Sequence, residues 1–137
     1  MGILLRSFLF CSFISSDFKA IGVKDVFYPP YDIFVFAFAT FKYKGKCDIR
    51  MNWYIESVPF CEYAITLPEK HDDERCAFSA IDLLQVEEKV KISIYKNWRV
   101  ELFINDKFMS FSNFRVKRLF YGFKFESFGS SRINISV

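Results

Sequence analysis

The stretch WRVELFINDKFMSFSNF, residues 98–114, alternates apolar and polar side chains on both sides of a central Asn105-Asp106 pair. A period of two places successive side chains on opposite faces of a β-strand. Asn and Asp tolerate left-handed backbone, so this pair can form the two-residue turn of a β-hairpin. Closing the hairpin there pairs Leu102 with Met109 on an apolar face. The stretch therefore predicts two antiparallel strands.

Residues 47–56, CDIRMNWYIE, alternate without interruption and predict a second strand with two distinct faces. One face is apolar and is expected to join the core: Cys47, Ile49, Met51, Trp53 and Ile55. The opposite face is a polar row: Asp48, Arg50, Asn52, Tyr54 and Glu56. One face of an antiparallel sheet is commonly solvated, so such a row is either plain surface or a binding face.

Further segments with the same period and β-branched or aromatic residues extend the pattern along the chain. We predict strands at 6–15, 32–41, 61–67, 90–94, 121–128 and 132–137, whereas 76–84 is either a strand or a helical turn. Residues 32–41 are apolar on both faces, as in a strand that is covered on each side or lies centrally in a sandwich. About ten short strands separated by turns predict an all-β sandwich or barrel, and 137 residues make one domain.

The N-terminal residues 1–16 have two interpretations. Arg6, an apolar stretch and Ser15-Ser16 loosely imitate a secretory signal, but the small-x-small cleavage pattern is missing. We favour a Phe-rich strand and keep the signal as the alternative. No charge-free run reaches the roughly 20 apolar residues of a spanning helix, so no membrane span is expected.

Composition argues against several function classes. The formal net charge of +3 is slight, and nucleic acid is not an expected partner. The four cysteines are far apart and the chain has one His, so we expect no metal, no cofactor and free, buried thiols. The one nucleophile candidate is Cys76 near His71, but the neighbouring acidic loop would raise a thiol pKa. We therefore expect no enzyme.

The second half of the chain, from about Cys47, resembles a divergent galectin domain. The corresponding segments are Val90–Ile94, Ile104-Asn105-Asp106, Phe108 with Phe111, Phe123-x-Phe125, Gly129 and Ile133–Val137. This resemblance implies a jelly-roll sandwich of two antiparallel sheets, and action in the cytoplasm or, by a non-classical route, outside the cell. Asn52, Tyr54 and Glu56 fall where the family has the His, Asn and Arg that hold galactoside, and only Glu74 and Arg75 remain of a second motif that has lost its Trp.

Two functions follow from the resemblance. The first is carbohydrate binding with altered preference, in a groove made by Arg50, Asn52, Tyr54, Glu56, Glu74 and Arg75. Ordinary galactoside binding is not expected, because each lost hydroxyl partner costs roughly 1–3 kcal/mol. The alternative is a protein–protein interaction module, homodimers included, anchored by Phe103 and Phe108 on the hairpin's outer face. That alternative requires that neither another sheet nor the N-terminal segment covers these rings.

Overall fold

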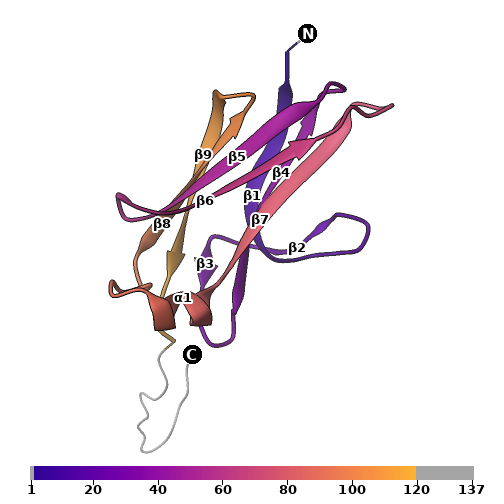
Figure 1. The fold of residues 1–137 in the computed structure, drawn as a ribbon. Helices are drawn as coiled ribbons and strands as arrows, with labels where there is room; N and C mark the ends of the chain where they lie inside the picture. Colours follow the sequence, from indigo (N-terminus) through magenta and orange to yellow (C-terminus); the bar gives the residue numbers. More distant parts are fainter. Residues whose placement is uncertain (1, 120–137) are drawn as a thin grey trace, which may run out of the picture.

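In a computed structural model, residues 2–119 are described and form two β-sheets packed face to face (Figure 1). The four-stranded sheet has the order β2-β1-β4-β7, with β1 Leu4–Ile14, β2 Ala20–Val23, β4 Phe34–Lys42 and β7 Glu74–Asp82. The five-stranded sheet has the order β3-β9-β8-β5-β6, with β3 Val26–Phe27, β5 Cys47–Ile55, β6 Val58–Leu67, β8 Asn97–Ile104 and β9 Lys107–Val116. The predicted sandwich is confirmed.

All strand pairs are antiparallel except β3 and β9, which run parallel over two residue pairs. The prediction of two antiparallel sheets is therefore confirmed, with this short parallel pair at one edge as the exception. The strand predicted at 6–15 is confirmed as β1, which is hydrogen-bonded between β2 and β4. The strands predicted at 121–128 and 132–137 lie outside the described residues.

Residues 76–84 contain both of the structures that the sequence left open. β7 continues to Asp82, and the helix α1 follows at Leu83–Lys89. The Asp82 carboxylate accepts hydrogen bonds from the backbone N–H groups of Leu84 and Gln85, at 3.0 and 3.1 Å. This N-cap satisfies two donors that a helix start leaves unpaired, so it marks the switch from strand to helix.

The strand predicted at Val90–Ile94 is wrong. The segment is a loop between α1 and β8, in which Ile92 is exposed and Ile94 is buried. The Val90 N–H donates to the Val86 carbonyl and closes the helix, while the Ile94 carbonyl accepts from the Trp98 indole at 2.9 Å. Its backbone groups thus serve a helix end and a side chain instead of a ladder.

The hairpin turn is confirmed, because Asn105 and Asp106 both have positive φ, 52° and 63°. The predicted register is wrong by one residue beyond Phe103, which faces Phe108 as expected. A bulge between Leu102 and Phe103 then places Leu102 opposite Ser110, not Met109. One extra residue on β9 produces this shift.

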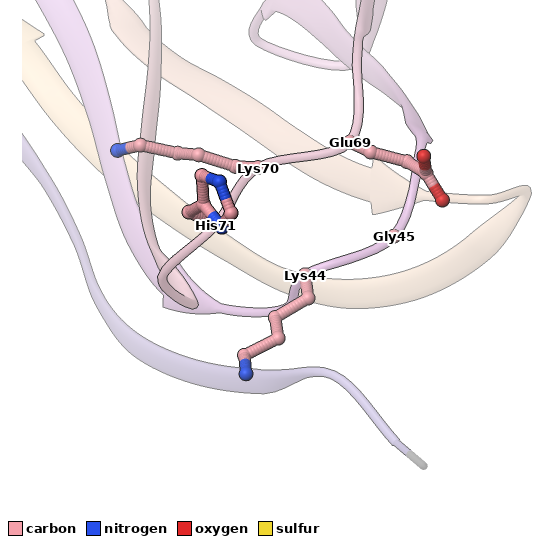
Figure 2. Close-up of a pocket in the computed structure, with 5 residues that line it drawn as sticks. All are labelled: Lys44, Gly45, Glu69, Lys70 and His71. Carbon is pink, nitrogen blue, oxygen red and sulfur yellow. The ribbon is translucent and has the colours of Figure 1, made fainter.

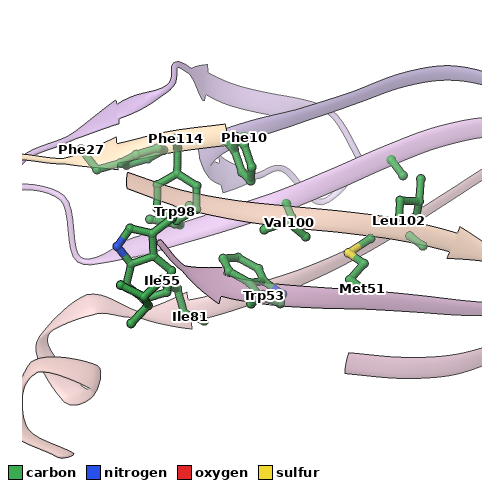
Figure 3. Close-up of a cluster of buried hydrophobic side chains, with 14 of the residues drawn as sticks. Phe10, Phe27, Met51, Trp53, Ile55, Ile81, Trp98, Val100, Leu102 and Phe114 are labelled. Atoms are coloured by element: carbon green, nitrogen blue, oxygen red, sulfur yellow. The ribbon is translucent and has the colours of Figure 1, made fainter. Parts of the chain in front are cut away.

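The core lies between the sheets and is dominated by rings (Figure 3). The Trp98 and Phe114 rings stack at 5.4 Å between centroids, and Trp53 meets Phe114 edge-on at 6.1 Å. β4 adds mainly small inward side chains, among them Ala37 and Ala39. Large rings from the five-stranded sheet and, apart from Phe10 and Phe41, smaller residues from the four-stranded sheet fill the interior at close packing.

Candidate functional site

The outer face of β5 carries the polar row predicted from the sequence. Trp53 is 1% exposed, and its indole N–H donates to the Ser79 hydroxyl at 2.9 Å across the core. Because neighbouring residues of a strand point to opposite sides, this burial places Asn52 and Tyr54 on the outside. The Oδ1 atom of Asn52 is buried and has no hydrogen-bond donor among the described residues.

Tyr54 is held by its neighbours on β8. Its hydroxyl donates to the Glu101 carboxylate at 3.1 Å, and Arg99 Nε donates to the same carboxylate at 3.2 Å. Burial raises the pKa of the Tyr54 phenol, and the hydrogen bond to Glu101 and its negative charge raise it further. The phenol therefore stays a protonated donor at neutral pH.

Arginine and aromatic side chains alternate across β5, β8 and β9. The guanidinium carbon of Arg99 lies 3.8 Å from the Phe111 ring centroid, and that of Arg50 lies 4.3 Å from the Phe103 centroid. Phe103 also meets Phe108 edge-on at 5.6 Å. We name this surface the aromatic–arginine face, made of Arg50, Tyr54, Arg99, Phe103, Phe108 and Phe111.

The aromatic–arginine face is open to solvent within the described part of the chain. Phe108 is 49% exposed and Phe111 is 45% exposed, and neither the other sheet nor β1 covers them. Arg50 also pairs with Asp106 at 3.1 Å, but that carboxylate is 92% exposed. The Arg50–Asp106 ion pair is therefore weak, while the cation–π contacts keep the two guanidinium groups against the Phe103 and Phe111 rings.

The remaining predicted groove residues lie elsewhere, so the six do not form one groove. Glu56 is a turn residue with φ 57°, and its carboxylate accepts the Asn97 N–H at 3.0 Å. Glu74 and Arg75 begin β7 in the opposite sheet, where Glu74 lies near Arg6 and Lys42. The resemblance to galectins implied that Glu74 and Arg75 lie in the same sheet as β5. After β6 the chain instead crosses to the four-stranded sheet, where β7 lies.

Arg75 has a structural role. It is 7% exposed, and its guanidinium donates to the carbonyls of Tyr43, Gly45 and Pro68 at 3.1, 3.1 and 2.7 Å. These bonds tie the β4–β5 loop to the β6–β7 loop. Because both terminal nitrogens of this buried guanidinium already donate to backbone carbonyls, Arg75 cannot form a two-point hydrogen-bonded contact with a ligand.

The same two loops enclose a shallow pocket of about 410 Å³ (Figure 2). Its lining side chains diverge: the ammonium groups of Lys44 and Lys70 point away from each other, and Glu69 points to the far side. Lys70 Nζ already donates to the Glu74 carbonyl at 2.8 Å. Without convergent charges this pocket is not a phosphate-type site.

The cysteines and the possible metal ligands within residues 2–119 bear on catalysis and metal binding. Burial raises the pKa of the Cys76 thiol, which disfavours the thiolate that a nucleophile needs. All four cysteines are free, with Cys11 and Cys47 buried as expected and Cys61 exposed, contrary to expectation. Within these residues no three His, Cys, Asp or Glu side chains are grouped to hold a metal ion, and no helix is long and apolar enough to cross a membrane.

Sequence reasoning missed a second exposed surface, on the four-stranded sheet. The register places Phe78 of β7 directly opposite Phe38 of β4 and diagonal to Phe36. The ring centroids of Phe36 and Phe78 are 6.0 Å apart, and Phe34 lies 6.3 Å from Phe36. Phe34 is 47% exposed and Phe78 is 36% exposed. Of the two interpretations of residues 32–41, the central position in the sandwich is confirmed, because β4 lies between β1 and β7; on its outer face Phe38 is 4% exposed, while Phe34 is open to solvent.

The strand arrangement is of the immunoglobulin type. The first, second and fifth main strands, β1, β4 and β7, form one layer, and β5, β8 and β9 form the other, as strands A, B, E and C, F, G do. The chain is similar to an immunoglobulin-like protein from Pseudomonas aeruginosa, with a TM-score of 0.50 and 11% sequence identity over 85% of this chain and 98% of that chain. This similarity extends to the fold alone.

No family model and no curated protein matches the sequence. The resemblance to galectins stays a sequence-based prediction, and the structural similarity found is to a different kind of β-sandwich. One of the segments that carried the resemblance, Val90–Ile94, is a loop in the structure.

Proposed function

We propose that this chain is a protein-binding module and that the aromatic–arginine face is its docking surface. The observation that carries the proposal is the composition of that face: four aromatic rings interleaved with two arginines on three adjacent strands. Arg and aromatic residues are the types enriched at protein interfaces and at their energetic hot spots.

The geometry favours a protein over a sugar as the partner. A sugar would stack its C–H surface on an open aromatic face. Here the Arg99 and Arg50 guanidinium groups lie over the Phe111 and Phe103 rings, so a sugar would have to displace a cation from each ring. A protein can instead accept the guanidinium N–H groups and contact the exposed ring edges of Phe108 and Phe111.

Site-specific photo-crosslinking tests the proposal. A photo-reactive phenylalanine analogue replaces Phe108 in the full chain, expressed in its natural host, and the matched control carries it at Phe13, which is similarly exposed at 56% on the other sheet. We expect a discrete cross-linked protein from position 108 that is absent from position 13. The identified partner should bind the purified chain, and Arg99→Ala with Phe111→Ser should weaken that binding at least about tenfold, as loss of hot-spot contacts does.

Two outcomes would overturn the proposal. One is the same cross-linked products from both positions, and the other is a partner that binds the Arg99 and Phe111 variant as tightly as the original chain. A glycan array run alongside addresses the carbohydrate prediction: a signal lost in Asn52→Ala with Tyr54→Ala would favour a sugar instead.

A further inference from the structure

The two sides of the sandwich end very differently. On one side the outermost strands are short, with four residues in β2 and two in β3. On the other side the outermost strands β6 and β7 have ten and nine residues, and no other described strand pairs with their free edges. A long, unpaired edge strand is a template for pairing with another strand.

β6 is protected from such pairing over its first third only. Pro59 cannot donate to a ladder, and the extra residue Phe60 makes a bulge against β5. From Cys61 to Leu67 the pairing with β5 is regular, and Glu62 is the sole charged side chain in these seven residues. Natural edges are usually blunted with Lys, Pro or bulges, and this segment has none of them.

We propose that two copies of this chain associate by antiparallel pairing of their β6 strands, about a two-fold axis at Ala64. In this register Tyr63 faces Ile65 of the second copy, and Cys61 faces its Leu67, all on the inward side. On the outer side Ala64 faces Ala64 and Glu62 faces Thr66, so the charged residue never meets its own copy. The strand is thus complementary to itself, as a two-fold interface requires.

The other long edge does not share this property. A two-fold pairing of β7 with itself, centred on Phe78, would place Glu74 directly opposite Asp82 at both ends of the ladder. Like charges directly opposite each other destabilise a strand pair. The charge pattern therefore selects β6 over β7 as the self-pairing edge.

A cavity beside β6 gives the second copy's inward side chains somewhere to lie. It has a volume of about 390 Å³ and lies between β6 and β7, lined by Tyr63, Ile65, Leu67, Cys76 and Phe78 among others. Ile65 is 39% exposed and Phe78 is 36% exposed in the single chain. Pairing at β6 would extend the sheet from five strands to ten and cover Ile65, whereas Phe78 lies on the outer face of β7.

Sedimentation velocity over a concentration series tests the association, and Ala64→Lys is the variant. It places two lysines opposite each other at the axis; because Ala64 is exposed but lies opposite Arg50, far-UV circular dichroism first establishes that the variant is folded. Ala80→Lys, at an exposed position of β7, is the matched control. We expect the original chain and Ala80→Lys to reach twice the mass of one chain, and Ala64→Lys to stay at the mass of one chain.

Disulfide trapping tests the register independently of stability. In a Cys61→Ser background, Ala64→Cys should form a covalent dimer on oxidation, because directly opposite residues lie about 4.5–5.5 Å apart between Cα atoms. Thr66→Cys should not, because the two copies of residue 66 would be about 13 Å apart along the ladder. An original chain that stays monomeric, an Ala64→Lys dimer, or equal trapping at 64 and 66 would overturn the proposal. Ala64 lies opposite Arg50 of the aromatic–arginine face, but none of these readouts measures binding at that face, so failure here leaves the proposed function standing.

Discussion

The hydrogen bond from the Trp53 indole to Ser79 provides a direct test of the β5 register. Both side chains are buried, at 1% and 4% exposure, and the donor–acceptor distance is 2.9 Å. Ser79→Ala leaves the indole N–H buried without an acceptor, which costs about 2 kcal/mol of the free energy of unfolding. With a urea m-value of about 2 kcal/mol per molar, the unfolding midpoint should fall by about 1 M.

Trp53→Phe supplies the control, because it removes the N–H donor. This variant loses roughly 2 kcal/mol through the smaller ring and its cavity. Adding Ser79→Ala to it should then cost under about 0.5 kcal/mol of the free energy of unfolding, because the indole N–H that Ser79 accepts is already absent. Urea unfolding of the four proteins, followed by far-UV circular dichroism, measures the cycle. A cost of Ser79→Ala that is equal in both backgrounds would refute the pairing, and with it the placement of Asn52 and Tyr54 on the outer face.

Three further variants probe the loops, the phenol and the turn. Arg75→Met should lower the free energy of unfolding by about 3 kcal/mol in urea, because three loop carbonyls lose a charged donor in a buried place. Glu101→Gln should lower the pKa of Tyr54 towards its ordinary value, seen as phenolate absorbance appearing at lower pH. Because the folded-state pKa of Tyr54 is raised, its contribution to stability is present below about pH 10 and lost as pH rises through that pKa. Asp106→Gly should raise the urea midpoint slightly, since φ 63° suits Gly and the lost ion pair is highly exposed.

Local periodicity predicted most of the strands and failed where tertiary contacts decide. The unbroken alternation of residues 47–56 correctly assigned both faces of β5, and two residues of αL type correctly marked the turn at Asn105-Asp106. Val90–Ile94 has the same alternation over only five residues. There the end of α1 and the Trp98 indole use its backbone groups, and no neighbouring strand is available. A short pattern cannot reveal such competition.

Local periodicity also predicted only those candidate site residues that lie on one strand. Arg50, Asn52 and Tyr54 share a face because they share one strand, and period two is a local property. Glu74 and Arg75 were assigned to the same groove by alignment. Whether the chain stays in one sheet or crosses to the other after β6 depends on long-range packing, which in this chain sends β7 to the other layer.

β4 shows why alternation cannot tell which face is inside. Its two faces are both apolar, and a rule that buries the larger side chains would turn Phe34 and Phe36 inward. The structure does the opposite, with Ala37 and Ala39 facing the core. The Trp53 indole reaches Ser79, which lies opposite Ala37 in the register, so close packing leaves room for only a small side chain at this point of β4. Of the outward rings of β4, Phe34 is 47% exposed, Phe36 is half-buried and Phe38 is 4% exposed, so most of this aromatic surface is already covered by its neighbours, whereas Phe108 and Phe111 of the aromatic–arginine face are 49% and 45% exposed.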